Sequence, residues 1–184
     1  AKILLETLKA LPNQLVTFEA DLEQRSLVIT TDTGMYKMAV DPPDDFPALP
    51  TSNDAEIMVP VERLMSGINY TIFATTSDEM RPAMTGVNVV VDFNKISFVA
   101  SDGHKLVRYH ALGTSTEQTG SFVIPKKAMS LLKGATPSEG NVYLKYNKSH
   151  AFFRFEETEV ICRLINQAYP DFNAVIPVNN KNVL

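Results

Sequence analysis

Residues 163–177, RLINQAYPDFNAVIP, have a weaker counterpart 126 positions earlier in the chain. At that offset Asp171-Phe172 falls on Asp45-Phe46, and apolar residues meet apolar residues in register, as Phe153 does with Leu27. A fixed spacing of one domain length is typical of a duplicated unit. We therefore expect the chain to contain the last part of one unit and nearly all of the next.

The composition is that of a folded protein. The 184 residues are 45% hydrophobic, so the chain can bury a core and is not expected to be disordered. No apolar run reaches the roughly 18 residues that a membrane-spanning helix needs. Cys162 is the only cysteine, which excludes an internal disulfide and fits a cytoplasmic location. Because it lies on a predicted strand, we interpret its thiol as core packing rather than as a nucleophile.

The charge is unevenly distributed along the chain. The formal net charge of -4 argues against a simple nucleic-acid binder, which is usually basic. Residues 41–56, however, contain five acidic residues and no Lys or Arg, whereas lysines gather on predicted helices. Such segregation can present one basic face on an acidic molecule.

Hydrophobic periodicity predicts an α+β fold, in which each helix accompanies several antiparallel strands and packs on one face of the sheets. Helices are expected over 2–11 and from Pro60 and Pro125, each proline at the first helical position. The proline-rich stretch 41–54 can continue neither a helix nor a ladder, so it predicts a linker. Strands are expected over 15–20, 26–31, 35–40, 56–59, 84–93, 96–100, 105–112, 122–124, 142–146, 151–155 and 159–164.

The same periodicity predicts which helix residues are buried. The first helix should bury Leu4, Leu5, Leu8 and Leu11, and the second Val61, Leu64, Met65, Ile68 and Ile72, with Arg63, Ser66 and Asn69 outside. The third should bury Ala128, Leu131, Leu132 and Ala135 and expose Lys126, Lys127, Ser130 and Lys133.

Four stretches in order carry a resemblance to a known family. They are SDEMRPAMTGV (77–87), FVASDGHKLVRY (98–109), FVIPKKAMSLLK (122–133) and the opening RLINQAYPDFNAVIP. Their order and spacing resemble the middle domain of the bacterial DNA polymerase III beta subunit, the sliding clamp. The resemblance implies the latter half of a first clamp domain at 1–50, a linker at 51–55, a complete second clamp domain at 56–180, and the start of a third at 181–184.

This resemblance implies a ring of clamp domains from a head-to-tail homodimer of the full-length protein, with paired helices on the inner face and antiparallel sheets outside. It implies a non-catalytic subunit of a DNA polymerase holoenzyme, a processivity factor for DNA replication. Such a factor encircles duplex DNA without reading its sequence and tethers the polymerase III alpha subunit, the clamp loader and other clamp-motif proteins. Tethering acts by raising effective concentration. We expect no membrane partner, no cofactor and no metal ion.

The resemblance also assigns cations to the DNA-facing side. These are Lys126, Lys127 and Lys133 on one inner helix, Arg63 on the other, Lys2 and Lys9 on the equivalent helix of the preceding unit, and Arg81 in the loop before Met84. Taken alone, a charged helix face is more simply explained as solvated surface. Each cation is expected to add a weak, salt-sensitive phosphate contact.

The family's peptide pocket maps onto Met84, Ser101, Gly103, His104, Lys105, Leu106, Pro170, Ala174 and Val175. An Asp-Gly hairpin exposes backbone groups, and apolar residues can form a floor for a leucine or phenylalanine anchor. The family more often has leucine at Met84, threonine at Ser101, and arginine at Lys105 and Ala174. The last departure puts in doubt a salt bridge to an acidic peptide residue. At Leu106 and Val175, ordinary core packing is an equally good explanation.

Two alternatives stay open from the residues. One is a peptide-binding module without a DNA role. The other is a hydrolase using Asp102, His104 or Cys162, although two residues across a tight turn are poor geometry for a proton relay. His110 and His150 show no spacing that would support a metal site or a relay.

Overall fold

The computed structural model describes residues 2–114 and 116–177, and the chain divides into two compact units, Ala1–Leu49 and Pro50–Leu184. The start of a third domain, predicted at 181–184, and the end of the second, at 178–180, lie outside the described residues. In the described part of the chain, no helix is long and apolar enough to cross a membrane.

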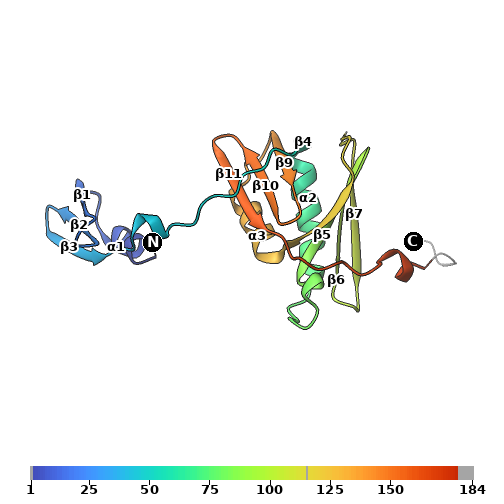
Figure 1. The fold of residues 1–184 in the computed structure, drawn as a ribbon, viewed down its shortest axis with the longest axis horizontal. Coiled ribbons are helices and arrows are strands. Elements are labelled where there is room, and N and C mark those ends of the chain that lie inside the picture. The colour runs from blue at the N-terminus through green and yellow to red at the C-terminus, as the bar shows by residue number, and fades with distance from the viewer. Residues whose placement is uncertain (1, 115, 178–184) are drawn as a thin grey trace. The chain divides into compact units, whose positions relative to one another are not determined.

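The first unit is one helix and one sheet (Figure 1). Helix α1 (Lys2–Ala10) precedes strands β1 (Val16–Asp21), β2 (Ser26–Thr31) and β3 (Gly34–Ala39), which form an antiparallel sheet in the order β1-β2-β3. A 3₁₀ turn, η1 (Pro43–Asp45), follows. Among the described residues of this unit, Ser26 and Ile29 alone are buried.

The predicted apolar face of α1 is therefore not a buried face. Leu5 is 52% exposed and no residue of α1 is buried. The amphipathic pattern is present, but Leu4, Leu8 and Leu11 are only partly buried. Leu15, Phe18 and Met35 are likewise half exposed or more.

The second unit contains two four-stranded antiparallel sheets, with orders β11-β10-β9-β4 and β7-β6-β5-β8. The unit consists of two halves, and each half contains, in chain order, one strand, one helix and three further strands. The first strand of each half joins the sheet of the other half: β4 pairs with β9, and β8 pairs with β5. The strands are β4 (Ile57–Pro60), β5 (Gly86–Asp92), β6 (Lys95–Ser101), β7 (Leu106–Leu112), β8 (Gly120–Pro125), β9 (Asn141–Tyr146), β10 (His150–Phe155) and β11 (Thr158–Arg163).

Helices α2 (Val61–Thr71) and α3 (Lys126–Ala135) contact each other and the sheets (Figure 1). Each begins directly after a strand that ends in proline. Pro60 and Pro125 have φ of -56° and -57° with extended ψ, so both are helix caps rather than the first helical residues that we predicted. A fixed φ near -65° suits the end of a strand and the cap of a helix equally, so one residue serves both.

The core of the second unit lies between helices and sheets. As predicted, Val61, Leu64 and Ile68 of α2 are buried. In α3 the prediction was partly wrong, because Met129 is fully buried whereas Leu131 is 59% exposed and Ala135 is also exposed. The buried stripe of α3 is Ala128, Met129 and Leu132.

The internal repeat has the predicted order of elements but not a constant offset. Phe18 lies opposite Ile29 in the first unit, and Leu144 lies opposite Phe153 in the second. Leu144 follows Phe18 by 126 residues, whereas Phe153 follows Ile29 by 124. The hairpin loop of the first unit is longer, so the gapless pairing of Phe153 with Leu27 does not hold when the two hairpins are aligned.

Candidate functional site

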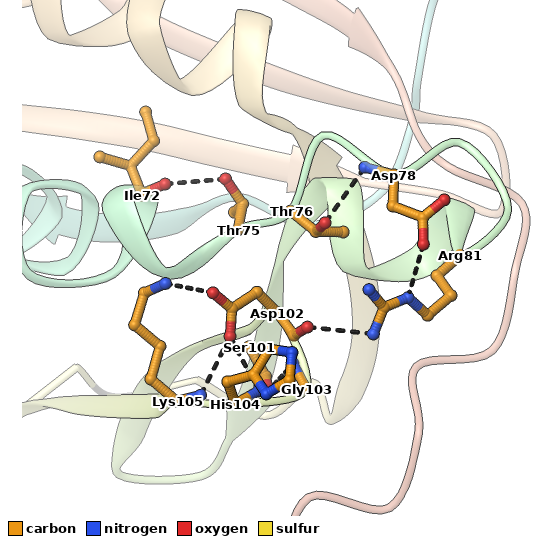
Figure 2. A network of polar contacts seen from close by, with 10 residues as sticks. All are labelled: Ile72, Thr75, Thr76, Asp78, Arg81, Ser101, Asp102, Gly103, His104 and Lys105. Carbon is orange, nitrogen blue, oxygen red and sulfur yellow. Dashed lines mark hydrogen bonds and ion pairs between the residues drawn. The ribbon is translucent and has the colours of Figure 1, made fainter.

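The hairpin between β6 and β7 is organised by the carboxylate of Asp102 (Figure 2). Its Oδ1 accepts hydrogen bonds from the backbone amides of His104 (2.9 Å) and Lys105 (3.0 Å). Its Oδ2 accepts a hydrogen bond from the Lys105 ammonium. Gly103 has a φ of +91°, a conformation that a residue with a Cβ rarely adopts, and its amide donates to Ser101 Oγ. The aspartate and glycine thus fix the shape of this turn.

A second loop, residues 76–84, lies beside this hairpin (Figure 2). The Thr76 amide donates to the carbonyl of Met84 over 3.0 Å, which closes the loop at its ends. Asp78 accepts from the Met80 amide at Oδ1 and from Arg81 Nε at Oδ2. A 3₁₀ turn, η3 (Pro82–Thr85), then carries Met84, which we had predicted to begin a strand.

The third part is the segment after β11. The Ile165 amide donates to the carbonyl of Val123 on β8 over 3.0 Å, and the chain then continues to the 3₁₀ turn η4 (Asn173–Val175). Arg108 on β7 donates to Asn173 Oδ1 over 3.3 Å. These bonds attach the segment to the β7-β6-β5-β8 sheet at both ends.

The three parts enclose a cavity of about 300 Å³. All of the predicted pocket residues except Ala174 line it: Met84, Ser101, Gly103, His104, Lys105, Leu106, Pro170 and Val175. Three lining residues were missed, Tyr169, Asp171 and Phe172. All three stand in the stretch around Pro170, and their nearness to Pro170 in the sequence was the one signal that could have found them.

A larger cavity of about 650 Å³ shares the segment from Tyr169 to Phe172 with the first. It is lined by residues 164–173 and by residues of β5, β8 and the turn that follows β9. The smaller cavity is the better candidate for an apolar anchor, because Met84, Leu106 and Val175 come together there from three separate elements.

The rim of the smaller cavity is polar but internally paired. The Lys105 ammonium and two backbone amides hold the pKa of Asp102 well below its usual range. Burial raises the pKa of Tyr169, so its hydroxyl is neutral at physiological pH. Because Lys105 is paired with Asp102, the cavity presents little free positive charge to a ligand.

The geometry does not favour the hydrolase alternative. The hydrogen bond between His104 and Asp102 runs from the His104 backbone amide, not from its imidazole. Burial raises the pKa of the Cys162 thiol to about 11, so it is protonated near neutral pH. Within residues 2–114 and 116–177, no group of three His, Cys, Asp or Glu side chains is arranged to hold a metal ion.

The predicted DNA-facing cations all lie at the surface of their own units. Lys126 and Lys127 occupy the first turn of α3 and Lys133 its last turn, and all three are exposed. Arg63 on α2 lies 3.5 Å from Glu62, and Arg81 is bound to Asp78. In the first unit, Lys2 lies 3.8 Å from Glu6, and Lys9 is in the last turn of α1.

Comparison with known proteins assigns most of the second unit to a family. A family profile described as "DNA polymerase III beta subunit, central domain" matches residues 58–171, which include all of the two four-stranded sheets except Ile57, and most of the residues that line the cavity. The chain belongs to this family.

Similar proteins and structures agree with the family match. The chain is 31% identical to a "Beta sliding clamp" of Staphylococcus epidermidis and 28% identical to one of Synechocystis, covering 97% and 96% of this chain. Among solved structures, DNA polymerase sliding clamps from Bacillus subtilis and Caulobacter crescentus superpose with TM-scores of 0.87 and 0.86, each at 26% identity and over 97% and 98% of this chain.

The beta-subunit family match comes with a difference in length. The chain spans 48% and 51% of the two clamp sequences, and 47% and 50% of the two structures. It therefore corresponds to about half of a beta subunit, and this half includes the central domain.

Proposed function

We propose that this chain acts as part of a DNA sliding clamp, a processivity factor that encircles duplex DNA and tethers the replicative polymerase. The supporting observation is the cavity formed by Met84, Leu106 and Val175 in a domain of the beta-subunit family. An apolar cavity beside a hairpin suits an extended peptide anchored by leucine or phenylalanine.

The charge on α3 supports the DNA part of the proposal. Two lysines occupy the first turn of this helix, where the helix dipole disfavours cations, and no acidic residue accompanies them. Lys126, Lys127 and Lys133 form no ion pair with any carboxylate in the described part of the chain. Unpaired lysines beside a helix N-terminus are well suited to weak, sequence-independent phosphate contacts.

In this proposal the full-length protein forms a homodimeric ring in the cytoplasm and has no catalytic activity of its own. Its partners are duplex DNA, the polymerase III alpha subunit, the clamp loader and other proteins with a clamp-binding motif. Positioning alone supplies the effect, because a tethered polymerase rebinds the primer end at high effective concentration.

Substitution in the cavity tests the peptide part. In a full-length clamp that contains this chain, Met84→Lys should weaken binding of a fluorescein-labelled peptide carrying a leucine-phenylalanine pair at least about tenfold, because a charge would enter the apolar floor. Met58→Lys is the matched control, since Met58 is 54% exposed on β4 and does not line the cavity. Equal peptide affinity of Met84→Lys and wild type would refute the pocket.

The peptide-binding module without a DNA role is the second candidate. In this candidate the cavity still binds a peptide, but the α3 lysines do not contact DNA. Processive primer extension by the same full-length protein separates the two: the module would not increase the length of DNA made per binding event, whereas a clamp would.

A further inference from the structure

Two loops that line the proposed peptide pocket are joined by one side chain. Arg81 Nε donates to Asp78 Oδ2 over 2.9 Å in the loop 76–84, and Arg81 Nη1 donates to the carbonyl oxygen of Asp102 over 3.0 Å in the hairpin (Figure 2). Among the described residues, the Arg81–Asp102 bond is the one hydrogen bond that joins this loop to this hairpin.

The sheet provides no other support on this side of the hairpin. The ladder between β5 and β6 ends at the pair Asn88–Val99. The last residues of β6 are therefore paired only with β7, whose ladder reaches Ser101–Leu106. The hairpin tip extends past the end of the β5 ladder, at the place where the Arg81 guanidinium meets it.

Gly103 leaves the space that the guanidinium occupies. A Cβ built on Gly103 would lie 2.7 Å from Arg81 Nη1, closer than a side chain can approach. The Asp102 carboxylate is already bound to His104 and Lys105, so the backbone carbonyl is the group left for Arg81. The hairpin is thus shaped to receive a planar, forked donor, which lysine cannot replace.

We propose that Arg81 is a positioning residue of the peptide pocket, which holds the Asp102–Lys105 hairpin against the loop that carries Met84. This inference rests on the proposed function of the cavity. It gives Arg81 a different role from the phosphate contact that the family resemblance implies, because two edges of the guanidinium already bind protein. Arg81 acts on the ligand through Ser101, Gly103 and His104, which line the cavity.

The experiment measures peptide binding without DNA. The whole 184-residue chain carries ¹⁵N label and is titrated with the leucine-phenylalanine peptide, and amide shifts give the dissociation constant even when binding is weak. Arg81→Gln should raise this constant about three- to tenfold, the scale for losing a partly exposed charge-assisted bond. It should also speed hydrogen exchange at the His104 and Lys105 amides.

A matched control and a conservative variant make the result specific. Lys95→Gln removes a cation that is similarly exposed (42% against 45%) and similarly paired to an aspartate three residues away, but at the opposite end of β6. It should leave peptide affinity unchanged. Arg81→Lys keeps the charge without the fork, so it should bind peptide as weakly as Arg81→Gln.

The outcomes separate the two proposals. Wild-type affinity and exchange rates in Arg81→Gln would overturn the positioning role while leaving the pocket in place. Full rescue by Arg81→Lys would also overturn it, because charge alone would then account for the effect. Absence of any peptide-induced shift at the cavity residues in the wild-type chain would refute the pocket and this inference with it.

Discussion

Gly67 on α2 lies directly against the ring of Phe98 on β6. A Cβ built on Gly67 would be 2.5 Å from Phe98 Cδ2, and both residues are buried. Helix and sheet therefore approach each other more closely here than any side chain on the helix would permit. This close approach fixes how α2 sits on the sheet that supports the candidate pocket.

Gly67→Ala should consequently destabilise the second unit, although alanine is the better helix former. Displacing a buried ring typically costs about 1–3 kcal/mol, more than the roughly 1 kcal/mol gained in helix propensity. Gly134→Ala on α3 is the control, because nothing lies within 4 Å of its Cβ position, and it should stabilise the chain. Urea unfolding of both variants checks the sign, and a stabilising Gly67→Ala would contradict the packing described.

The two units should open independently. In the first unit, Ser26 and Ile29 alone of the described residues are buried, whereas the second has an extensive core. Since apolar burial is the main source of stability, β1–β3 should lose their structure first. Hydrogen exchange of the whole chain measures the order of unfolding. The backbone amides of β2 should exchange during local opening of the first unit, while the backbone amides of β10 stay protected. Equal protection in both sheets would show a single cooperative unit instead.

The ion pairs of Glu56 should make a small pH-dependent contribution. Arg154 Nη2 lies 2.9 Å from both carboxylate oxygens and Lys145 lies 3.4 Å from one, and the Arg154 guanidinium holds the pKa of Glu56 below its usual range. Stability from this group is therefore present above pH 4.5 and is lost as pH falls through the lowered pKa.

Because Glu56 is a third exposed, Glu56→Gln should cost less than about 1 kcal/mol at pH 7. The cost should shrink as the pH falls below 4.5. Glu157→Gln, an exposed residue without an ion pair among the described residues, is the control and should have no effect at either pH.

The single thiol should react slowly and only in strong base. With its pKa raised from 9.0 to about 11 by burial, Cys162 carries about a hundredfold less thiolate at pH 8 than an unperturbed thiol. The thiol of the unfolded chain loses its proton at a lower pH than the buried thiol does. The contribution of Cys162 to folding stability is therefore complete below pH 9 and is lost as pH rises toward 11. Labelling rates with iodoacetamide measure the first effect. Cys162→Ala should remove the part of the decrease in folding stability between pH 9 and 11 that comes from this thiol.

The lysines of α3 should contribute to the salt dependence of DNA binding. In a full-length clamp, changing Lys126, Lys127 and Lys133 to Gln should reduce the slope of log K against log salt by up to about 0.9 for each phosphate that is no longer neutralised. Lys148→Gln, in the exposed turn between β9 and β10, serves as the control. An unchanged slope in the triple variant would place the DNA-facing surface elsewhere.

The order of helices and strands in the second unit could be predicted, because the hydrophobic periodicity and the positions of the turn residues indicate the same elements. The buried face of α3 could not be predicted, because two sets of residues follow helical spacing. One is the observed set 128, 129 and 132, and the other is the predicted set 128, 131, 132 and 135. Only the packing of α3 on its sheet selects Met129 over Leu131. The start of β5 was misplaced because Pro82 begins a 3₁₀ turn, which an apolar run does not reveal.

The candidate pocket was predicted from resemblance rather than from the physics of single residues. Nothing local to Met84, Leu106 or Val175 indicates that three distant segments meet. Tyr169 and Phe172 have no periodicity that marks them as lining residues. The role of Arg81 could be recognised only in three dimensions, because its partner is a backbone carbonyl, which has no signature in the sequence.

The exchange of β4 and β8 between the two sheets makes the halves of the second unit mutually dependent. Peptides cut between β7 and β8 would each carry a strand that belongs in the other's sheet, so neither could complete its own ladder alone. Mixed together, they have the means to reassemble by complementation. During synthesis, β4 cannot pair with β9 until some eighty further residues have been made.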